Sequence, residues 1–188
     1  TLAAQLSPET HSYSIRLSRT YISQGNTELA QRRLAEIFAI PGVAVSDLLQ
    51  VVELFLALQD AESAYFLLQR IKNESHALPP LALLLETASR FQKQQQIDKA
   101  LMVVQYAIDT TPDIFGLYVF QADLLVEIRN LTTALASLQQ AAQILTKKTD
   151  GAPTSHDVLP GWFNGYQVPS GVYYRLGLLL RQVGKLDE

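Results

Sequence analysis

The residues of this chain that could carry chemistry are few and dispersed. Its three histidines, His11, His76 and His156, have no ligand-type partner at the i, i+4 spacing of a helix, so the sequence predicts no metal site. The run Ser155-His156-Asp157 contains the residue types of a hydrolase triad. Three consecutive residues cannot, however, form the relay of nucleophile, base and orienting group. We therefore expect no catalytic site in these residues.

Cofactor signatures are also absent from the sequence. It contains no glycine-rich phosphate loop and no dinucleotide fingerprint, and its carboxylates show no pair suited to acid and base roles. The chain has no Cys, which excludes disulfides and thiolate chemistry but fits either an oxidising or a reducing compartment. The sequence thus predicts no cofactor and no enzyme activity for these residues, while a catalytic domain elsewhere in a larger parent protein stays open.

Composition restricts the partners. The 188 residues are 48% hydrophobic, which is enough to bury a continuous core. A net charge of −3 and the absence of any Lys or Arg run longer than two argue against nucleic acid as a partner. The longest apolar run, near Leu81 to Leu85, is far shorter than the roughly 20 residues that span a bilayer. Abundant Leu and Ala favour helices.

A repeated spacing of small residues indicates how these helices are organised. Four alanines follow polar turns at intervals of 34, 36 and 34 residues: Ala30, Ala64, Ala100 and Ala134. If these alanines are the twentieth position of a repeat, four repeats begin at His11, Val45, Leu81 and Phe115. Apolar residues at three- and four-residue spacing before and after each turn predict two amphipathic helices per repeat.

The third repeat shows the family resemblance best. The following residues of Leu81 to Ile114 stand in register: Leu84, Ala88, Phe91, Ala100, Val104, Ala107 and Pro112. This pattern resembles the tetratricopeptide repeat (TPR) family, from which Ile37 and Ile71 depart by standing where the family prefers Ala. The resemblance implies an all-α fold, a right-handed α-solenoid superhelix of antiparallel helix pairs.

The register divides the chain into parts of one predicted solenoid domain. The predicted parts are the end of a preceding repeat (1–10), four repeats (11–44, 45–78, 81–114 and 115–148), an insertion (149–169), and the first helix and turn of a further repeat (170–188). We expect the chain to be a fragment of a longer array.

The predicted insertion is rich in Gly, Pro and aromatic residues and contains the only Trp of the chain. Three interpretations stay open for it. Trp162, Phe163 and Tyr166 could fold back and cover an edge of the fourth repeat, because aromatic side chains bury large areas. They could instead form a ligand surface, since insertions in repeat proteins often lie on a binding face. The segment could also lack fixed structure.

The family resemblance implies a binding groove lined by the first helix of each repeat. Carrying over its inner positions gives these groove candidates: Leu49, Glu53, Leu85, Glu86, Ser89, Val119, Phe120, Asp123 and Glu127. Such a groove is apolar with an acidic edge and would suit a basic or amphipathic helical segment. Its apolar members could equally be core between neighbouring helices. The Lys and Asn residues with which some family members grip a terminal carboxylate are missing, so that function is not transferred.

The function implied by the resemblance is a protein–protein interaction scaffold that presents a concave groove to a protein or peptide. Large bacterial assembly or secretion proteins are one setting that would suit it. Fold alone does not decide function. The alternatives are a substrate-recruiting region of a larger enzyme, such as a glycosyltransferase, and the ligand-sensing array of a regulator. Compartment and oligomeric state are not decided by the sequence.

Overall fold

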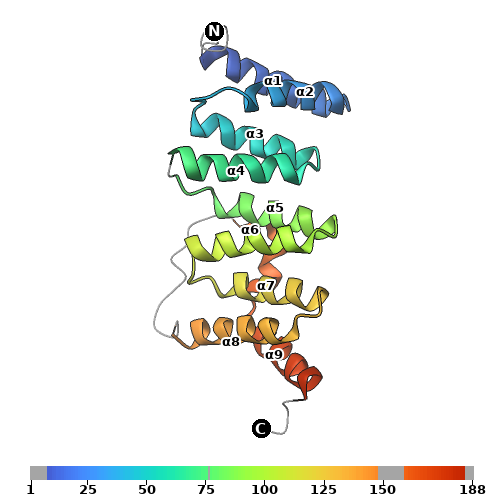
Figure 1. The fold of residues 1–188 in the computed structure, drawn as a ribbon, viewed down its shortest axis with the longest axis vertical. Helices are drawn as coiled ribbons and strands as arrows, with labels where there is room; N and C mark the ends of the chain where they lie inside the picture. The colour runs from blue at the N-terminus through green and yellow to red at the C-terminus, as the bar shows by residue number, and fades with distance from the viewer. Residues whose placement is uncertain (1–7, 76, 148–158, 185–188) are drawn as a thin grey trace. The chain divides into compact units, whose positions relative to one another are not determined.

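The computed structural model describes residues 8–75, 77–147 and 159–184, and within these ranges it is helical, with no strand (Figure 1). His76 and the Ser155-His156-Asp157 run lie outside the described residues. The predicted all-α fold is confirmed. The elements are α1 (Pro8–Ser23), α2 (Thr27–Phe38), α3 (Val45–Ala57), α4 (Ala61–Ser75), α5 (Leu81–Lys93), α6 (Ile97–Thr110), α7 (Phe115–Glu127), α8 (Leu131–Lys147), the 3-10 helix η3 (Gly161–Gln167) and α9 (Pro169–Val183).

The chain divides into two compact units, an N-terminal unit (Thr1–Pro79) and a C-terminal unit (Pro80–Glu188). In the N-terminal unit α1 packs on α2 and α3 packs on α4, and in the C-terminal unit α5 packs on α6 and α7 packs on α8. These are helical hairpins, as expected for a TPR-like helical repeat. Helices α3, α5 and α7 begin at Val45, Leu81 and Phe115, the residues at which the sequence predicts repeats to start.

Two other helices begin earlier than the predicted repeat parts. Helix α1 begins at Pro8 rather than at His11, and α9 begins at Pro169 rather than at Ser170. A proline is tolerated in the first turn of a helix, because the N–H it lacks has no intrahelical acceptor there. Both helices can therefore start on a proline that the repeat register places outside the repeat.

The first helix of each hairpin ends in the same way. The second residue after the helix takes a left-handed conformation, and the residue that follows it donates its backbone N–H to a carbonyl five residues earlier, as in a Schellman motif. The left-handed residues are Gly25, Gln59, Gln95 and Arg129, with φ between 60° and 77°. Only Gly adopts this region without a steric penalty. Three of the four turns therefore hold a strained side-chain-bearing residue.

The alanines that define the repeat are each fully buried: Ala30, Ala64, Ala100 and Ala134. They lie in the first turns of α2, α4, α6 and α8. A small side chain there lets the two helices of a hairpin approach closely. Close-packed helices leave few voids, so a larger residue would have to push them apart.

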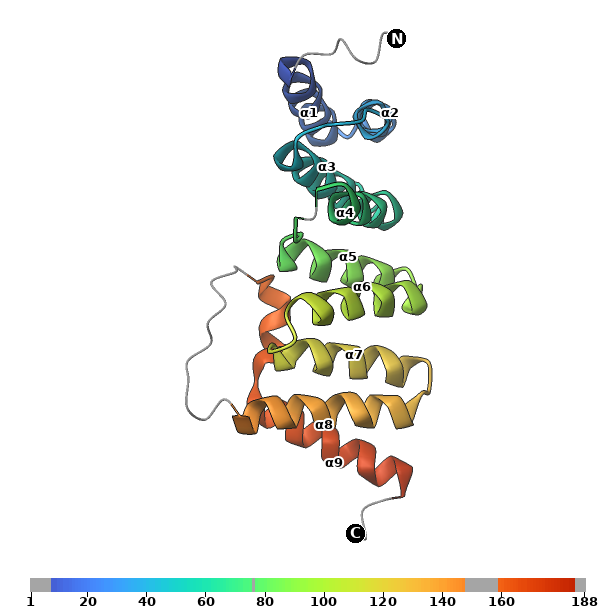
Figure 2. The ribbon, with the colours of Figure 1, turned by 60° about the vertical axis from the view of Figure 1, so that its left-hand side comes forward.

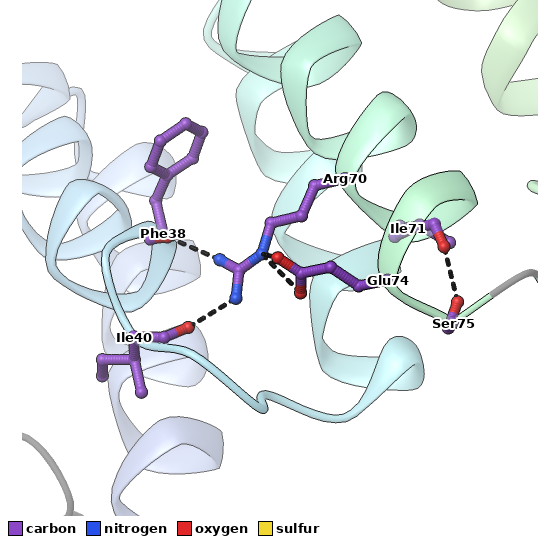
Figure 3. Close-up of polar contacts among 6 residues, drawn as sticks. All are labelled: Phe38, Ile40, Arg70, Ile71, Glu74 and Ser75. Atoms are coloured by element: carbon purple, nitrogen blue, oxygen red, sulfur yellow. Dashed lines mark hydrogen bonds and ion pairs between the residues drawn. The ribbon is translucent and has the colours of Figure 1, made fainter.

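In the N-terminal unit, Arg70 of α4 connects two hairpins. Its guanidinium donates to the carbonyl oxygens of Phe38 and Ile40, at 2.7 Å each, where α2 ends (Figure 3). It also pairs with Glu74 at 2.9 Å. The last carbonyls of a helix have no intrahelical partner, so a cation there satisfies them and complements the helix dipole. Arg70 thus caps α2 from the neighbouring hairpin.

Candidate protein-binding surface

A cluster of four aromatic rings joins η3 to the repeat helices of the C-terminal unit. Phe120 of α7 lies 5.4 Å from Trp162, 6.4 Å from Phe163 and 5.1 Å from Tyr166, measured between ring centroids. These separations are those of favourable edge-to-face and tilted aromatic pairs. Phe120 and Phe163 are fully buried, whereas Trp162 is 37% exposed. The segment η3 therefore covers α7 with an aromatic face.

The sequence of η3 explains how it presents that face. Pro160 precedes it, and the Phe163 N–H donates to the Pro160 carbonyl oxygen at 2.9 Å, which starts the 3-10 turn. A 3-10 helix has about three residues per turn, so residues three apart lie above one another. Phe163 and Tyr166 are accordingly stacked, with centroids 5.5 Å apart. Pro169 then begins α9, which leaves η3 between two proline-marked boundaries.

Gly116 allows the backbone of η3 to approach α7. A Cβ added to this residue would lie 3.0 Å from the Tyr166 carbonyl oxygen and 2.9 Å from Nε2 of Gln167. The Gln167 amide can move aside, but the Tyr166 carbonyl belongs to the backbone, so a side chain at residue 116 would require the backbone of η3 to shift by a few tenths of an ångström. Figure 2 shows η3 and α9, in orange and red, beside the hairpins of the C-terminal unit.

Two carboxylates of the repeat helices accept hydrogen bonds from side chains of η3. The Trp162 indole N–H donates to Oε2 of Glu86 at 3.1 Å, and the Tyr166 hydroxyl donates to the carboxylate of Asp123. Each carboxylate also has a cation. Arg90 lies 3.2 Å from Glu86, and Nε of Arg175 lies 3.1 Å from Oδ1 of Asp123. Each of these two carboxylates therefore has one hydrogen-bond donor from η3 and one cationic partner outside η3.

We call Glu86, Gly116, Phe120 and Asp123 together the aromatic site.

Burial changes the acid–base behaviour of this cluster. It raises the pKa of the Asp123 carboxyl above 3.8, although Arg175 and the Tyr166 hydroxyl oppose that shift. Burial and the Asp123 charge also raise the pKa of the Tyr166 hydroxyl, which is thus a proton donor at neutral pH. The Arg175 guanidinium lies 5.5 Å from the centroid of the Tyr166 ring, within cation–π range.

The predicted groove residues are distributed over both compact units. Leu49 and Glu53 lie on α3 in the N-terminal unit, and the other seven lie on α5 and α7 in the C-terminal unit. Glu86, Phe120 and Asp123 contact η3, while Val119 belongs to the core formed by α7, α8 and α9.

The remaining groove candidates differ in exposure. Leu85 and Ser89 are buried, Leu49 is half-buried, and Glu53 and Glu127 are exposed. Glu127 accepts a hydrogen bond from Gln92. The structure therefore brings three of the nine candidates together with the predicted insertion surface, which is the set Trp162, Phe163 and Tyr166.

The groove prediction omitted Arg175, which pairs with Asp123. A signal for it was present, because residue 175 occupies an inner position, the sixth, if the repeat register is continued from Ser170. The predicted groove comprises inner positions of the complete repeats alone, and residue 175 lies in the partial repeat that follows them. Gln167 was omitted as well, and nothing in its local sequence indicates that it approaches Gly116.

A small cavity of about 170 Å³ continues the aromatic site along α7 and α9. Its lining is Ala122, Asp123, Val126, Leu138, Arg175, Leu178, Leu179 and Gln182. Val126 and Leu178 are exposed large apolar residues at this cavity, so the uncovered part of the face is partly apolar. An incoming apolar side chain would gain by removing this surface from water.

Neither a metal site nor a membrane span is found in the part of the chain that the structure describes. Among residues 8–75, 77–147 and 159–184, no three His, Cys, Asp or Glu side chains form a group that could hold a metal ion. None of the helices described is both long and apolar enough to cross a membrane.

No protein-family model matches the chain, and no curated protein sequence matches it. It is similar to a solved structure titled "Functional Characterization of Pseudomonas Aeruginosa pilF", with 14% sequence identity over 93% of this chain and 92% of that chain and a TM-score of 0.40. At that identity and TM-score, nothing about function follows from the likeness.

Proposed function

We propose that this chain is a protein-interaction scaffold of TPR type, in which the first helices of the hairpins receive a segment of a protein partner. One observation carries the proposal. The face of α5 and α7 already holds a segment from outside the hairpins, η3, through aromatic contacts and hydrogen bonds to Glu86 and Asp123. Burial of aromatic anchors in a preformed site is how protein interfaces gain most of their affinity.

The uncovered cavity between α7 and α9 is the place where a partner would extend this contact. Its exposed members Val126 and Leu178 offer apolar area, and Arg175 and Asp123 lie beside them. Those two charges neutralise one another, as do Glu86 and Arg90, so the acidic edge expected from the sequence is reduced. We therefore propose a partner segment that is mainly apolar rather than strongly basic.

The experiment compares two apolar-to-acidic substitutions on the same unit. Leu178→Glu changes a residue at the cavity that is 46% exposed, and Met102→Glu changes a residue on α6 that is 56% exposed. Both side chains are about half exposed to water, so either change should cost little stability. Each variant is immobilised and incubated with an extract of the source cells, and the captured proteins are quantified.

We expect the Leu178→Glu protein to lose the captured partner and the Met102→Glu protein to retain it, while both variants melt at the same temperature. A partner lost only from Met102→Glu would place binding on the second helices and overturn the proposed surface. Capture unchanged by Leu178→Glu would overturn it too.

A further inference from the structure

We propose that the aromatic site is a receptor for a partner segment with the spacing Trp-Phe-x-x-Tyr, and that η3 is its intramolecular competitor. The proposal rests on the proposed function and adds to it the chemistry of the partner and a built-in control of access. In the free chain Trp162, Phe163 and Tyr166 occupy the site, and a partner must replace them.

The charges of the site permit such an exchange. Glu86 and Asp123 are half-buried, and a carboxylate removed from part of its water is destabilised when it loses every hydrogen-bond donor. Glu86 keeps Arg90 at 3.2 Å when the Trp162 indole leaves, and Asp123 keeps Arg175 at 3.1 Å when the Tyr166 hydroxyl leaves. When η3 leaves, both carboxylates therefore still have a cationic partner.

The apolar atoms of the site define what must replace η3. Three rings of η3 cover Phe120, and removing them would expose the fully buried Phe120 ring to water. Exposed aromatic area is unfavourable, so the site needs an occupant that again supplies aromatic surface. A segment with only polar or basic residues would not satisfy this requirement.

The hydrogen bonds and the backbone define the spacing. A nitrogen donor must reach Oε2 of Glu86, as the Trp162 indole does at 3.1 Å, and a hydroxyl must reach Asp123 four residues later, as Tyr166 does. Gly116 leaves room for the main chain of the occupant, since a Cβ there would lie 3.0 Å from the Tyr166 carbonyl oxygen. A Trp-Phe-x-x-Tyr segment in a 3-10 turn meets all of these conditions.

The test uses a fluorescein-labelled peptide with the sequence of residues 159–168, LPGWFNGYQV, and fluorescence anisotropy. The protein is the full chain, as wild type and as the double variant Trp162→Ala/Tyr166→Ala, in which η3 loses two of its three rings. A tethered segment competes at an effective concentration of about 1 mM, which weakens apparent peptide affinity about ten-fold when the free segment binds with a Kd of about 0.1 mM. We therefore expect the double variant to bind the peptide at least about ten-fold more tightly than wild type. A peptide with its three aromatic residues changed to Ala is the control ligand.

A third protein adds Gly116→Ala to the double variant. Because the new Cβ obstructs the main chain of any occupant, the gain in peptide affinity should disappear while the circular dichroism melt persists. If the double variant does not fold, Trp162→Ala alone replaces it, because that side chain is 37% exposed, and a smaller gain of about three-fold is expected. Equal peptide binding by wild type and by the folded variant would overturn the proposal, as would undiminished binding after Gly116→Ala.

The same proteins separate this proposal from the proposed function. One outcome would overturn only the competitor role of η3: Leu178→Glu abolishes partner capture, but the double variant captures no more partner than wild type. The scaffold function would then remain in place. Capture that Leu178→Glu leaves unchanged would instead contradict the scaffold surface, whatever the peptide does.

Discussion

A methyl group added to Gly116 should weaken the C-terminal unit, whereas the same group added to Gly177 should stabilise it. Gly116 lies in the first turn of α7, directly under η3, and Gly177 lies in the middle of α9. A Cβ on Gly177 meets no atom within 4 Å, while a Cβ on Gly116 meets the backbone of η3 at 3.0 Å. Gly177→Ala is therefore the matched control for Gly116→Ala.

The expected magnitudes follow from these surroundings. Replacing Gly by Ala inside a helix gains up to about 1 kcal/mol, which Gly177→Ala should realise in full. At Gly116, on the second residue of its helix, the propensity gain is smaller and is opposed by overpacking, which typically costs about 1–3 kcal/mol. We expect a net loss of about 1 kcal/mol for Gly116→Ala, or roughly 4 °C in melting temperature for a unit of this size.

The assay is urea unfolding followed by circular dichroism and by the emission of Trp162, the only Trp of the chain. Because Trp162 lies in η3, its emission should shift to the red and become more accessible to acrylamide in Gly116→Ala but not in Gly177→Ala. The close approach of η3 to α7 would be refuted if both variants gained stability equally and the emission of Trp162 stayed unchanged.

Three further predictions concern the remaining features. Arg70→Met should lower the free energy of unfolding by about 2–4 kcal/mol, because two charge-assisted hydrogen bonds of a side chain that is 11% exposed are lost. The control Glu74→Gln changes a partner that is 56% exposed and should cost less than about 1 kcal/mol in the same urea titration. Gln95→Gly should raise the melting temperature by relieving a left-handed residue at φ 61°, and Gly25→Ala at φ 77° should lower it, each through about 1 kcal/mol. The folded-state pKa of Asp123 is raised, so its contribution to stability is present below pH 3.8 and is lost as pH rises through that raised pKa. The free energy of unfolding of wild type and of Asp123→Asn is measured from below pH 3.8 to neutral pH, and wild type should lose stability relative to the variant as the pH rises. A difference between the two proteins that does not change with pH would contradict this prediction.

The helical hairpins could be predicted because their signals are local. The alanine spacing and the apolar positions around it are properties of short segments, and the starts of α3, α5 and α7 coincide with the predicted residues. Their left-handed turn residues were not predicted. A glycine such as Gly25 indicates a left-handed conformation from sequence alone. Residues such as Gln59 and Arg129 do not, because the surrounding helices impose the left-handed conformation on them.

The aromatic site could be predicted only in part, because it joins residues far apart in the sequence. The inner positions of the family indicated Glu86, Phe120 and Asp123, and composition indicated Trp162, Phe163 and Tyr166. One of the three interpretations of the insertion placed these rings on an edge of the fourth repeat, to which Phe120 and Asp123 belong, but neither pattern indicated a contact with Glu86. Their contact depends on where the chain returns after α8 and on the absence of a side chain at residue 116. Whether the predicted groove binds a partner stays a prediction.

The bonds from Arg70 to the end of α2 bear on how the N-terminal unit opens. A repeat protein whose hairpins touch only through apolar surfaces can lose its terminal hairpin first, because each interface contributes its own small term. Here the last turn of α2 cannot separate from α4 without breaking both hydrogen bonds from the Arg70 guanidinium to the Phe38 and Ile40 carbonyl oxygens. The amides of α2 and α4 should therefore exchange with deuterium in a single cooperative step, and the first two hairpins should behave as one folding unit.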